Sequence, residues 1–112
     1  MPKRNDRVAP PPGDDEWDVR FGTSDAAKGW ESLCNQARGN THKAWQILRS
    51  TPRVIPPTAR HHQLKGNLGI DGGLEQWQIE VTGGGRIHYV IDDDKRTVFI
   101  KAASTGHPKK TE

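Results

Sequence analysis

The segment from Leu74 to His107 restricts the fold of this chain more than any other, because its residues alternate as strands do. The alternating apolar positions are Trp77, Ile79, Val81, Ile87, Tyr89 and Ile91. A period of two is typical of strands that bury one face. A glycine triplet at 83–85 and a polar run at 92–96 provide turns, and residues 97–103 are rich in Val, Phe and Ile. The segment predicts three consecutive antiparallel strands.

Two amphipathic helices are expected before these strands. A first strand over 16–22 precedes a helix that begins near Ser24 and ends at Gly39, where a glycine after a helix is common. The second helix begins at residue 40 or 41 and ends before Pro52, since the residue before a proline resists helical geometry. The two helices form a hairpin that needs a flat surface to cover.

One further strand over 61–66 and a glycine-rich loop over 67–73 complete the order. The sequence thus predicts an α+β domain in which a two-helix hairpin packs on one face of a mainly antiparallel sheet of four to five strands, in the order β-α-α-β-β-β-β. The other face is expected to be concave and polar, and to carry Arg86 and His88. Core positions are expected for at least three of Trp17, Trp30, Trp45 and Trp77.

Length and composition fit one domain with a small core, since 31% of the 112 residues are hydrophobic. Residues 1–16 contain four of the eight prolines and several charges. Such a segment cannot bury enough apolar surface to offset the entropy of ordering. We expect a disordered arm over 1–16 and a single domain over 17–110.

Composition also bears on location and on metal binding. No apolar run approaches the roughly 20 residues of a membrane helix, and the amino terminus lacks the apolar stretch of a signal peptide. A cytoplasmic protein without a membrane partner is expected. The single cysteine, Cys34, excludes an intramolecular disulfide and a cysteine-based zinc site, and is expected to be a small buried side chain. His61 and His62 point to opposite faces of a strand, so no metal or other cofactor is expected.

Basic residues cluster in two segments of the chain. Between Leu48 and Leu74 the only carboxylate is Asp71, while the basic residues are Arg49, Arg53, Arg60, His61, His62 and Lys65. The carboxy-terminal segment adds Lys101, His107, Lys109 and Lys110. If the sheet brings the two segments together, they form one patch able to hold phosphates.

The order WQIxV, a short glycine turn, RIxYxIDDDxRTVFI and then GHPKK resembles the carboxy-terminal half of RelE-type toxins of bacterial toxin–antitoxin pairs, above all the YoeB-like and actinobacterial branches. The resemblance extends over roughly residues 17–110. It implies a RelE-like fold and a ribosome-dependent messenger RNA endoribonuclease that uses no metal. Implied partners are the ribosome, its messenger RNA and a cognate antitoxin, a DNA-binding protein encoded next to the toxin.

The resemblance also implies roles for individual residues. Arg86, which opens the strand RIHY, matches the arginine that contacts the scissile phosphate. His62 precedes a Leu-Lys pair at the place of a catalytic glutamate, and His107 matches a histidine near the carboxy terminus. These two histidines are the candidate proton carriers, and which is the base and which the acid stays open. Substrate contacts are expected from Lys65, His88, His61, Arg60, Lys109 and Lys110.

Two departures from the pattern affect the expected activity. Gln78 and Glu80 stand where RelE toxins have lysines, and Glu80 is expected opposite His88, where a carboxylate raises the pKa of an imidazole. Simpler interpretations are a surface arginine at Arg86, polar edge residues at His61 and His62, and a solvated tail at His107. Two alternative functions follow: a ParE-like toxin that inhibits gyrase without RNA chemistry, and a catalytically weak RNA-binding or ribosome-binding relative.

Overall fold

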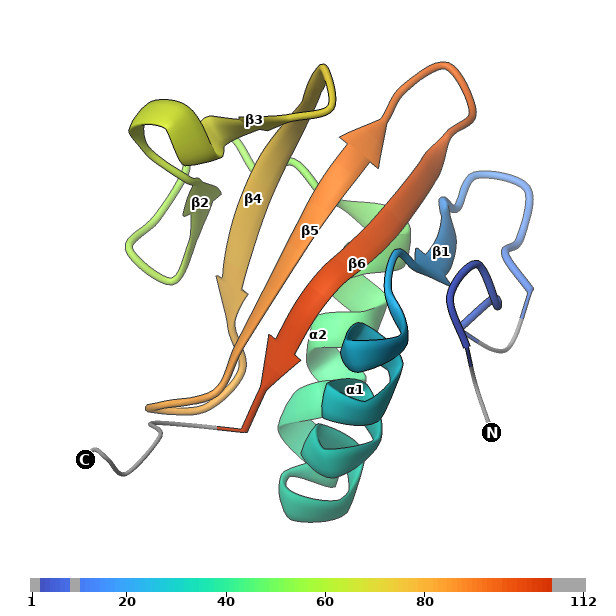
Figure 1. Ribbon diagram of the computed structural model, residues 1–112, viewed down its shortest axis with the longest axis vertical. Coiled ribbons are helices and arrows are strands. Elements are labelled where there is room, and N and C mark those ends of the chain that lie inside the picture. The colour runs from blue at the N-terminus through green and yellow to red at the C-terminus, as the bar shows by residue number, and fades with distance from the viewer. Residues whose placement is uncertain (1–2, 9–10, 106–112) are drawn as a thin grey trace.

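The computed structural model describes residues 3–8 and 11–105 (Figure 1). Its elements in chain order are β1 (Asp18–Phe21), α1 (Ser24–Gln36), α2 (Arg38–Ser50), β2 (His61–Gln63), a short 3₁₀ helix η1 (Gly66–Gly69), β3 (Ile70–Asp71), β4 (Leu74–Glu80), β5 (Arg86–Asp92) and β6 (Thr97–Ser104). The predicted α+β class is confirmed, but the sheet has six strands instead of four to five, because η1 and β3 lie in the segment expected to be a glycine-rich loop. None of the described helices has the length and apolarity needed to cross a membrane.

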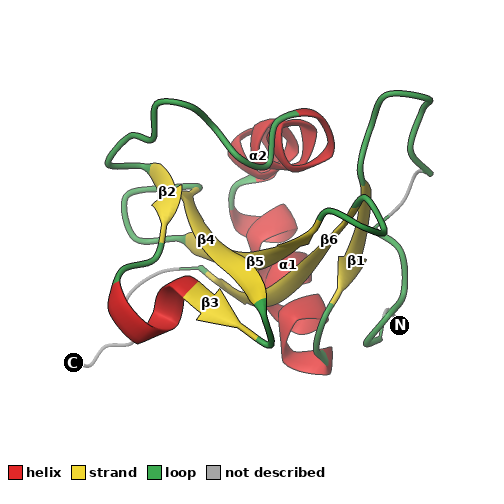
Figure 2. Cartoon of the chain, turned by 90° about the horizontal axis from the view of Figure 1, so that it is seen from above, coloured by secondary structure: helices red, strands yellow, loops and turns green. Residues whose placement is uncertain are grey.

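The sheet is mixed, although most of its pairings are antiparallel. Its strand order is β1-β6-β5-β4-β2, and β3 pairs with the same edge of β4 as β2. The first strand lies parallel to the last, with Val19 opposite Val98 and Phe21 opposite Ile100. This parallel pairing across the whole domain gives no local signal in the sequence. Figure 2 shows α2 on one side of the sheet.

The core lies between the sheet and the helix pair. Its largest fully buried side chains are Tyr89, Leu33, Leu48, Ile87, Ile91, Ile100, Val98 and Thr41. Trp30 and Trp77 are buried, and Trp17 and Trp45 are partly buried against the same cluster, so all four tryptophans contribute to packing. Cys34 is half-buried and packs beside them, and burial raises the pKa of its thiol. The sheet face turned away from this core is called the outer face below.

The helix boundaries differ from those that the sequence predicts. Thr23, one residue earlier than expected, caps α1 by accepting a hydrogen bond from the Ala26 N–H at 2.9 Å. The chain then turns at Ala37 alone, and Gly39 lies inside the first turn of α2 instead of after α1. The Thr41 hydroxyl holds the two helices together by donating to the Leu33 carbonyl at 3.0 Å. A buried side-chain bond thus replaces the expected glycine cap.

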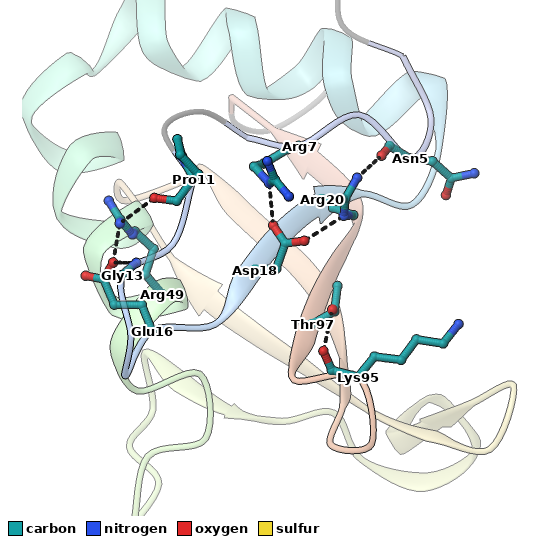
Figure 3. Close-up of polar contacts among 10 residues, drawn as sticks. All are labelled: Asn5, Arg7, Pro11, Gly13, Glu16, Asp18, Arg20, Arg49, Lys95 and Thr97. Carbon is teal, nitrogen blue, oxygen red and sulfur yellow. Dashed lines mark hydrogen bonds and ion pairs between the residues drawn. The ribbon is translucent and has the colours of Figure 1, made fainter.

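Part of the arm predicted to be disordered pairs with β1. The Val8 N–H donates to the Val19 carbonyl at 2.7 Å, and Val8 is buried in the core. The Asp18 carboxylate accepts from both Arg7, at 2.9 Å, and Arg20, at 2.7 Å (Figure 3). Composition did not reveal these contacts because they depend on one apolar residue and on the otherwise open edge of β1.

The same close-up shows a second attachment of the arm (Figure 3). Arg49 of α2 forms an ion pair with Glu16 and donates to the Pro11 carbonyl, while Glu16 also accepts from the Gly13 N–H at 2.7 Å. The guanidinium of Arg49 lies over the ring of Trp45, 4.2 Å from its centroid. These contacts fix the entry of the chain into β1.

Helix α1 approaches β6 so closely that only glycine fits at residue 29. A Cβ added to Gly29 would lie 1.9 Å from the Ala103 carbonyl oxygen, whereas one added to Gly39 meets nothing within 4 Å. We predict that Gly29→Ala lowers the free energy of unfolding by about 1–3 kcal/mol or more, because helix and strand must separate. Gly39→Ala, the matched control, raises it by up to about 1 kcal/mol through helix propensity. Equilibrium urea denaturation measures both, and equal stability of the two variants would contradict the close contact.

Candidate functional site

The register of the β4–β5 hairpin determines which polar side chains meet on the outer face. Glu80 pairs with Arg86 and Gln78 pairs with His88. The expectation that Glu80 lies opposite His88 is therefore wrong. The Thr82 hydroxyl accepts from the Gly85 N–H at 2.7 Å and closes the turn around residue 83, one residue before the middle of the glycine triplet. Glu80 therefore faces a residue of β5 two positions before the one expected.

Arg86 forms an ion pair with the carboxylate that faces it. Its Nη1 lies 2.8 Å from Oε2 of Glu80, and Nε of Arg60 lies 3.5 Å from the other oxygen of the same carboxylate. The Arg86 side chain is about a third exposed and Glu80 is less exposed. Two guanidinium groups thus share one carboxylate, which leaves a net positive cluster in which any phosphate competes with Glu80 for both arginines.

His88 forms a hydrogen bond with Gln78 across the hairpin. Its Nε2 lies 2.8 Å from Oε1 of Gln78, and because that oxygen can only accept, Nε2 carries the proton. Burial lowers the pKa of His88, and the neighbouring charge of Arg86 lowers it further. The expected rise in this pKa beside Glu80 is thus also wrong, because Glu80 faces the arginine instead.

His62 lies on the edge strand β2, in register with Gln78, which in turn is in register with His88. The Nδ1 of His62 is 3.1 Å from the Thr58 carbonyl oxygen, which can only accept, so Nδ1 is the protonated nitrogen of the neutral ring. Its Nε2 is then left with a lone pair. A histidine oriented in this way has the tautomer that a general base requires.

A broad hollow of about 730 Å³ adjoins His62 at the β2 edge of the sheet. One wall is the proline-rich connection between α2 and β2, including Val54 and Pro57, and the other wall includes Trp77 of β4. Lys65 also lines the hollow. Sequence reasoning singled out His62 and Lys65 but missed the hollow, because its walls come from segments that are distant in the chain.

Arg53, which sequence reasoning noted only as one of a group of basic residues, links three segments at this edge. It donates to the Glu75 carboxylate at 3.0 Å and to both oxygens of Asp93 at 3.1 and 3.2 Å. Glu75 also accepts from the Trp77 indole N–H at 3.0 Å. These hydrogen bonds, the one from Trp77 first, lower the pKa of Glu75, and those from Arg53 to Asp93 and Glu75 raise the pKa of Arg53. The network fixes the loop onto the sheet.

His61 faces the core and not the outer face. It is buried, its Nε2 contacts the hydroxyl of Tyr89 and lies 3.2 Å from the Pro52 carbonyl, and its ring packs edge-on against Trp77. Alternation along β2 thus separates His61 from His62, as expected, and removes His61 from the surface where RNA contacts were expected. Its role is to join Tyr89 of β5 to the end of α2.

Three of the expected site residues, His107, Lys109 and Lys110, lie outside the described residues. The structure brings together Arg86, Arg60, His88 and Gln78 on neighbouring strands, with His62 and Lys65 at the adjoining edge. In the described part of the chain, no group of three His, Cys, Asp or Glu side chains is placed to hold a metal ion. Comparisons with protein-family models, curated proteins and solved structures gave no match to this chain.

Acid is predicted to destabilise the fold through its buried histidines. Burial lowers the pKa of His61 and of His88 in the folded chain, whereas the unfolded chain has ordinary values of about 6.5. Below that pH the unfolded state binds more protons, so stability falls as the pH drops from 7.5 towards the folded pKa values.

Urea denaturation at pH 7.5 and 5.5 measures this loss. We expect His61→Gln to lower stability at pH 7.5 but to reduce the difference between the two pH values. His42→Gln, which removes an exposed imidazole of α2, is the control and keeps the wild-type difference. An unchanged pH dependence in His61→Gln would show that His61 is not buried in its neutral form.

Proposed function

We propose that this protein is a RelE-like toxin: a metal-independent endoribonuclease that cleaves messenger RNA on the ribosome and so inhibits translation. The observation that carries the proposal is the row of His62, Gln78 and His88 across three adjacent strands, with Arg86 two residues beyond His88 on the same face. The resemblance in sequence adds support, as does the α+β architecture of two helices against a mostly antiparallel sheet, although η1 and β3 are additions to the expected β-α-α-β-β-β-β order. A cytoplasmic location and a cognate DNA-binding antitoxin belong to the same proposal.

The proposed reaction is attack of the RNA 2′-hydroxyl on the adjacent phosphate, which yields a cyclic phosphate and a 5′-hydroxyl end. His62 accepts the 2′-hydroxyl proton at Nε2, since its Nδ1 is committed to the Thr58 carbonyl. Arg86 stabilises the charge that develops on the phosphorane oxygens. Substrate selectivity for RNA over DNA follows from the need for a 2′-hydroxyl.

The departing 5′-oxygen needs an acid, and His107 is the candidate. His107 lies outside the described residues and follows β6, whose Ser104 pairs with Arg86. The acid role of His107 therefore rests on the resemblance in sequence.

The first test is Arg86→Ala in cells that express the protein under a tight promoter. Loss of the guanidinium should restore growth and reduce cleavage of translated messages by at least about a hundredfold, the usual effect of removing a transition-state donor. Arg38→Ala, which removes an exposed arginine at the start of α2, is the matched control and should remain toxic. Primer extension on a translated message and incorporation of labelled methionine are the measurements.

Each alternative function gives a different outcome in that experiment. Filamentation and DNA damage with intact messages would indicate a ParE-like gyrase inhibitor. Absence of both effects, with the protein still bound to ribosomes, would indicate a catalytically weak relative. The ion pair between Glu80 and Arg86 favours the catalytically weak relative, because the carboxylate of Glu80 competes with a phosphate for the guanidinium of Arg86.

Replacement of Glu80 tests whether that pairing limits activity. Glu80→Gln keeps the shape of the side chain and removes the charge that Arg86 and Arg60 share. We expect three- to tenfold tighter binding of single-stranded RNA, about 1 kcal/mol, with a steeper salt dependence because more cations are free to contact phosphates. Fluorescence anisotropy at two salt concentrations measures the change. Weaker binding would show that Glu80 positions Arg86 instead of competing with the substrate.

A further inference from the structure

Among the described residues, most cations of the outer face form ion pairs, and this restricts where a phosphate can bind. Arg20 is held by Asp18, Arg86 and Arg60 by Glu80, and Lys101 lies 3.4 Å from Asp71. Lys65 differs, because no ion pair or hydrogen bond of its side chain is found within the described residues. It is exposed at the β2 edge, where it lines the hollow together with His62. An anion therefore meets the least competition at this edge.

The hollow itself has the character of a ligand site. Its volume of about 730 Å³ lies within the roughly 300–1,000 Å³ of small-molecule sites. Val54, Pro57 and Ala59 make one wall apolar, and the indole of Trp77, fixed by its bond to Glu75, contributes to the other. Ile55 also lines the hollow. Its side chain is 83% exposed and does not belong to the core.

We propose that this hollow binds one nucleotide of a single-stranded RNA, with the base against Val54, Ile55 and Pro57 and the phosphate on Lys65. A nucleobase presents two apolar faces and a polar edge, which matches apolar walls around a few fixed polar groups. The Gln63 amide and the Arg53–Glu75 pair are among the polar groups that line the hollow. The free Nε2 of His62 lies at the same edge, so the bound nucleotide is next to the proposed base.

The inference rests on the proposed function and adds to it a substrate subsite distinct from the Arg86 cluster. Arg86, His88 and Glu80 do not line the hollow. The register places Arg86 two strands from β2, with β4 between them. With strands about 4.8 Å apart, the two places are separated by about 10 Å or more. Gln63, Glu75 and Trp77 line the hollow from the core-facing side of the sheet, whereas Arg86 is on the outer face. The RNA would thus pass around the β2 edge, where His62 lies, between the hollow and Arg86.

Two pairs of matched variants test the subsite without disturbing the fold. Ile55→Ala removes an exposed aliphatic side chain at the hollow, and Ile70→Ala removes one of the same size, 54% exposed, on β3 outside it. Lys65→Ala removes a charge at the hollow, and Lys43→Ala removes an exposed one on α2. Binding of a fluorescein-labelled eight-nucleotide RNA is followed by anisotropy between 50 and 200 mM salt.

We expect Ile55→Ala to weaken binding about three- to tenfold at every salt concentration, since the lost contact is apolar. Lys65→Ala should weaken it most at low salt and reduce the slope of log K against log salt by about 0.7–1. The two control variants should stay within twofold of the wild type. Equal effects in each matched pair would overturn the subsite.

Two further ligands separate a free nucleotide from a polymer and the subsite from the catalytic proposal. Adenosine and uridine monophosphates, titrated with NMR detection of the Trp77 indole, should shift that signal in the wild type and not in Lys65→Ala. If RNA binds by way of Ile55 and Lys65 but messages are never cleaved, the subsite stands and the nuclease falls. If cleavage depends on Arg86 while Ile55 and Lys65 have no effect on binding, the subsite falls and the nuclease stands.

Discussion

The register of the β4–β5 hairpin is the constraint on which the rest of the outer face depends. Hydrogen bonds of Gly85 close the turn: its N–H donates to the Thr82 hydroxyl, and its carbonyl accepts from the N–H groups of Val81 and Thr82. That turn brings Glu80 against Arg86 and Gln78 against His88, while Trp77 meets Tyr89 in the core. A shift of one residue in a hairpin centre changes every opposing pair by two positions. The electrostatics of the face thus follow from the geometry of one five-residue connection.

Charge pairing on this sheet serves the fold and opposes anion binding at the same time. Each carboxylate that accepts an arginine bond holds two elements together, as Glu75 and Asp93 do when they attach Arg53 and its loop to the sheet. The same carboxylates lower the potential that a phosphate would experience at those arginines. Lys65 has no such partner in the described part of the chain, so it contributes little to the fold and leaves its charge available.

The sequence predicted those features that arise from local periodicity. Alternation in β4 and β5 correctly placed Trp77 and Ile87 in the core and Arg86 on the other face, and it separated His61 from His62. It did not predict the hairpin centre, because three consecutive glycines fit more than one turn. The parallel β1–β6 pairing and the walls of the hollow join distant segments, for which a single sequence carries no register information. The binding of Val8 to the core depends on one apolar residue in a proline-rich arm.

The two edges of the sheet are treated differently, and this favours one direction of approach for a partner. At β1 the backbone is paired with the arm through Asn5 and Val8, and Asp18 locks Arg7 in place, so an incoming strand would have to displace those bonds. At the opposite edge β2 spans only His61–Gln63 and the chain then leaves the strand through Leu64. A short edge strand discourages sheet extension by another protein chain. Single-stranded RNA binds through side-chain contacts and needs no backbone hydrogen bonds to a strand, so a short edge strand does not hinder it.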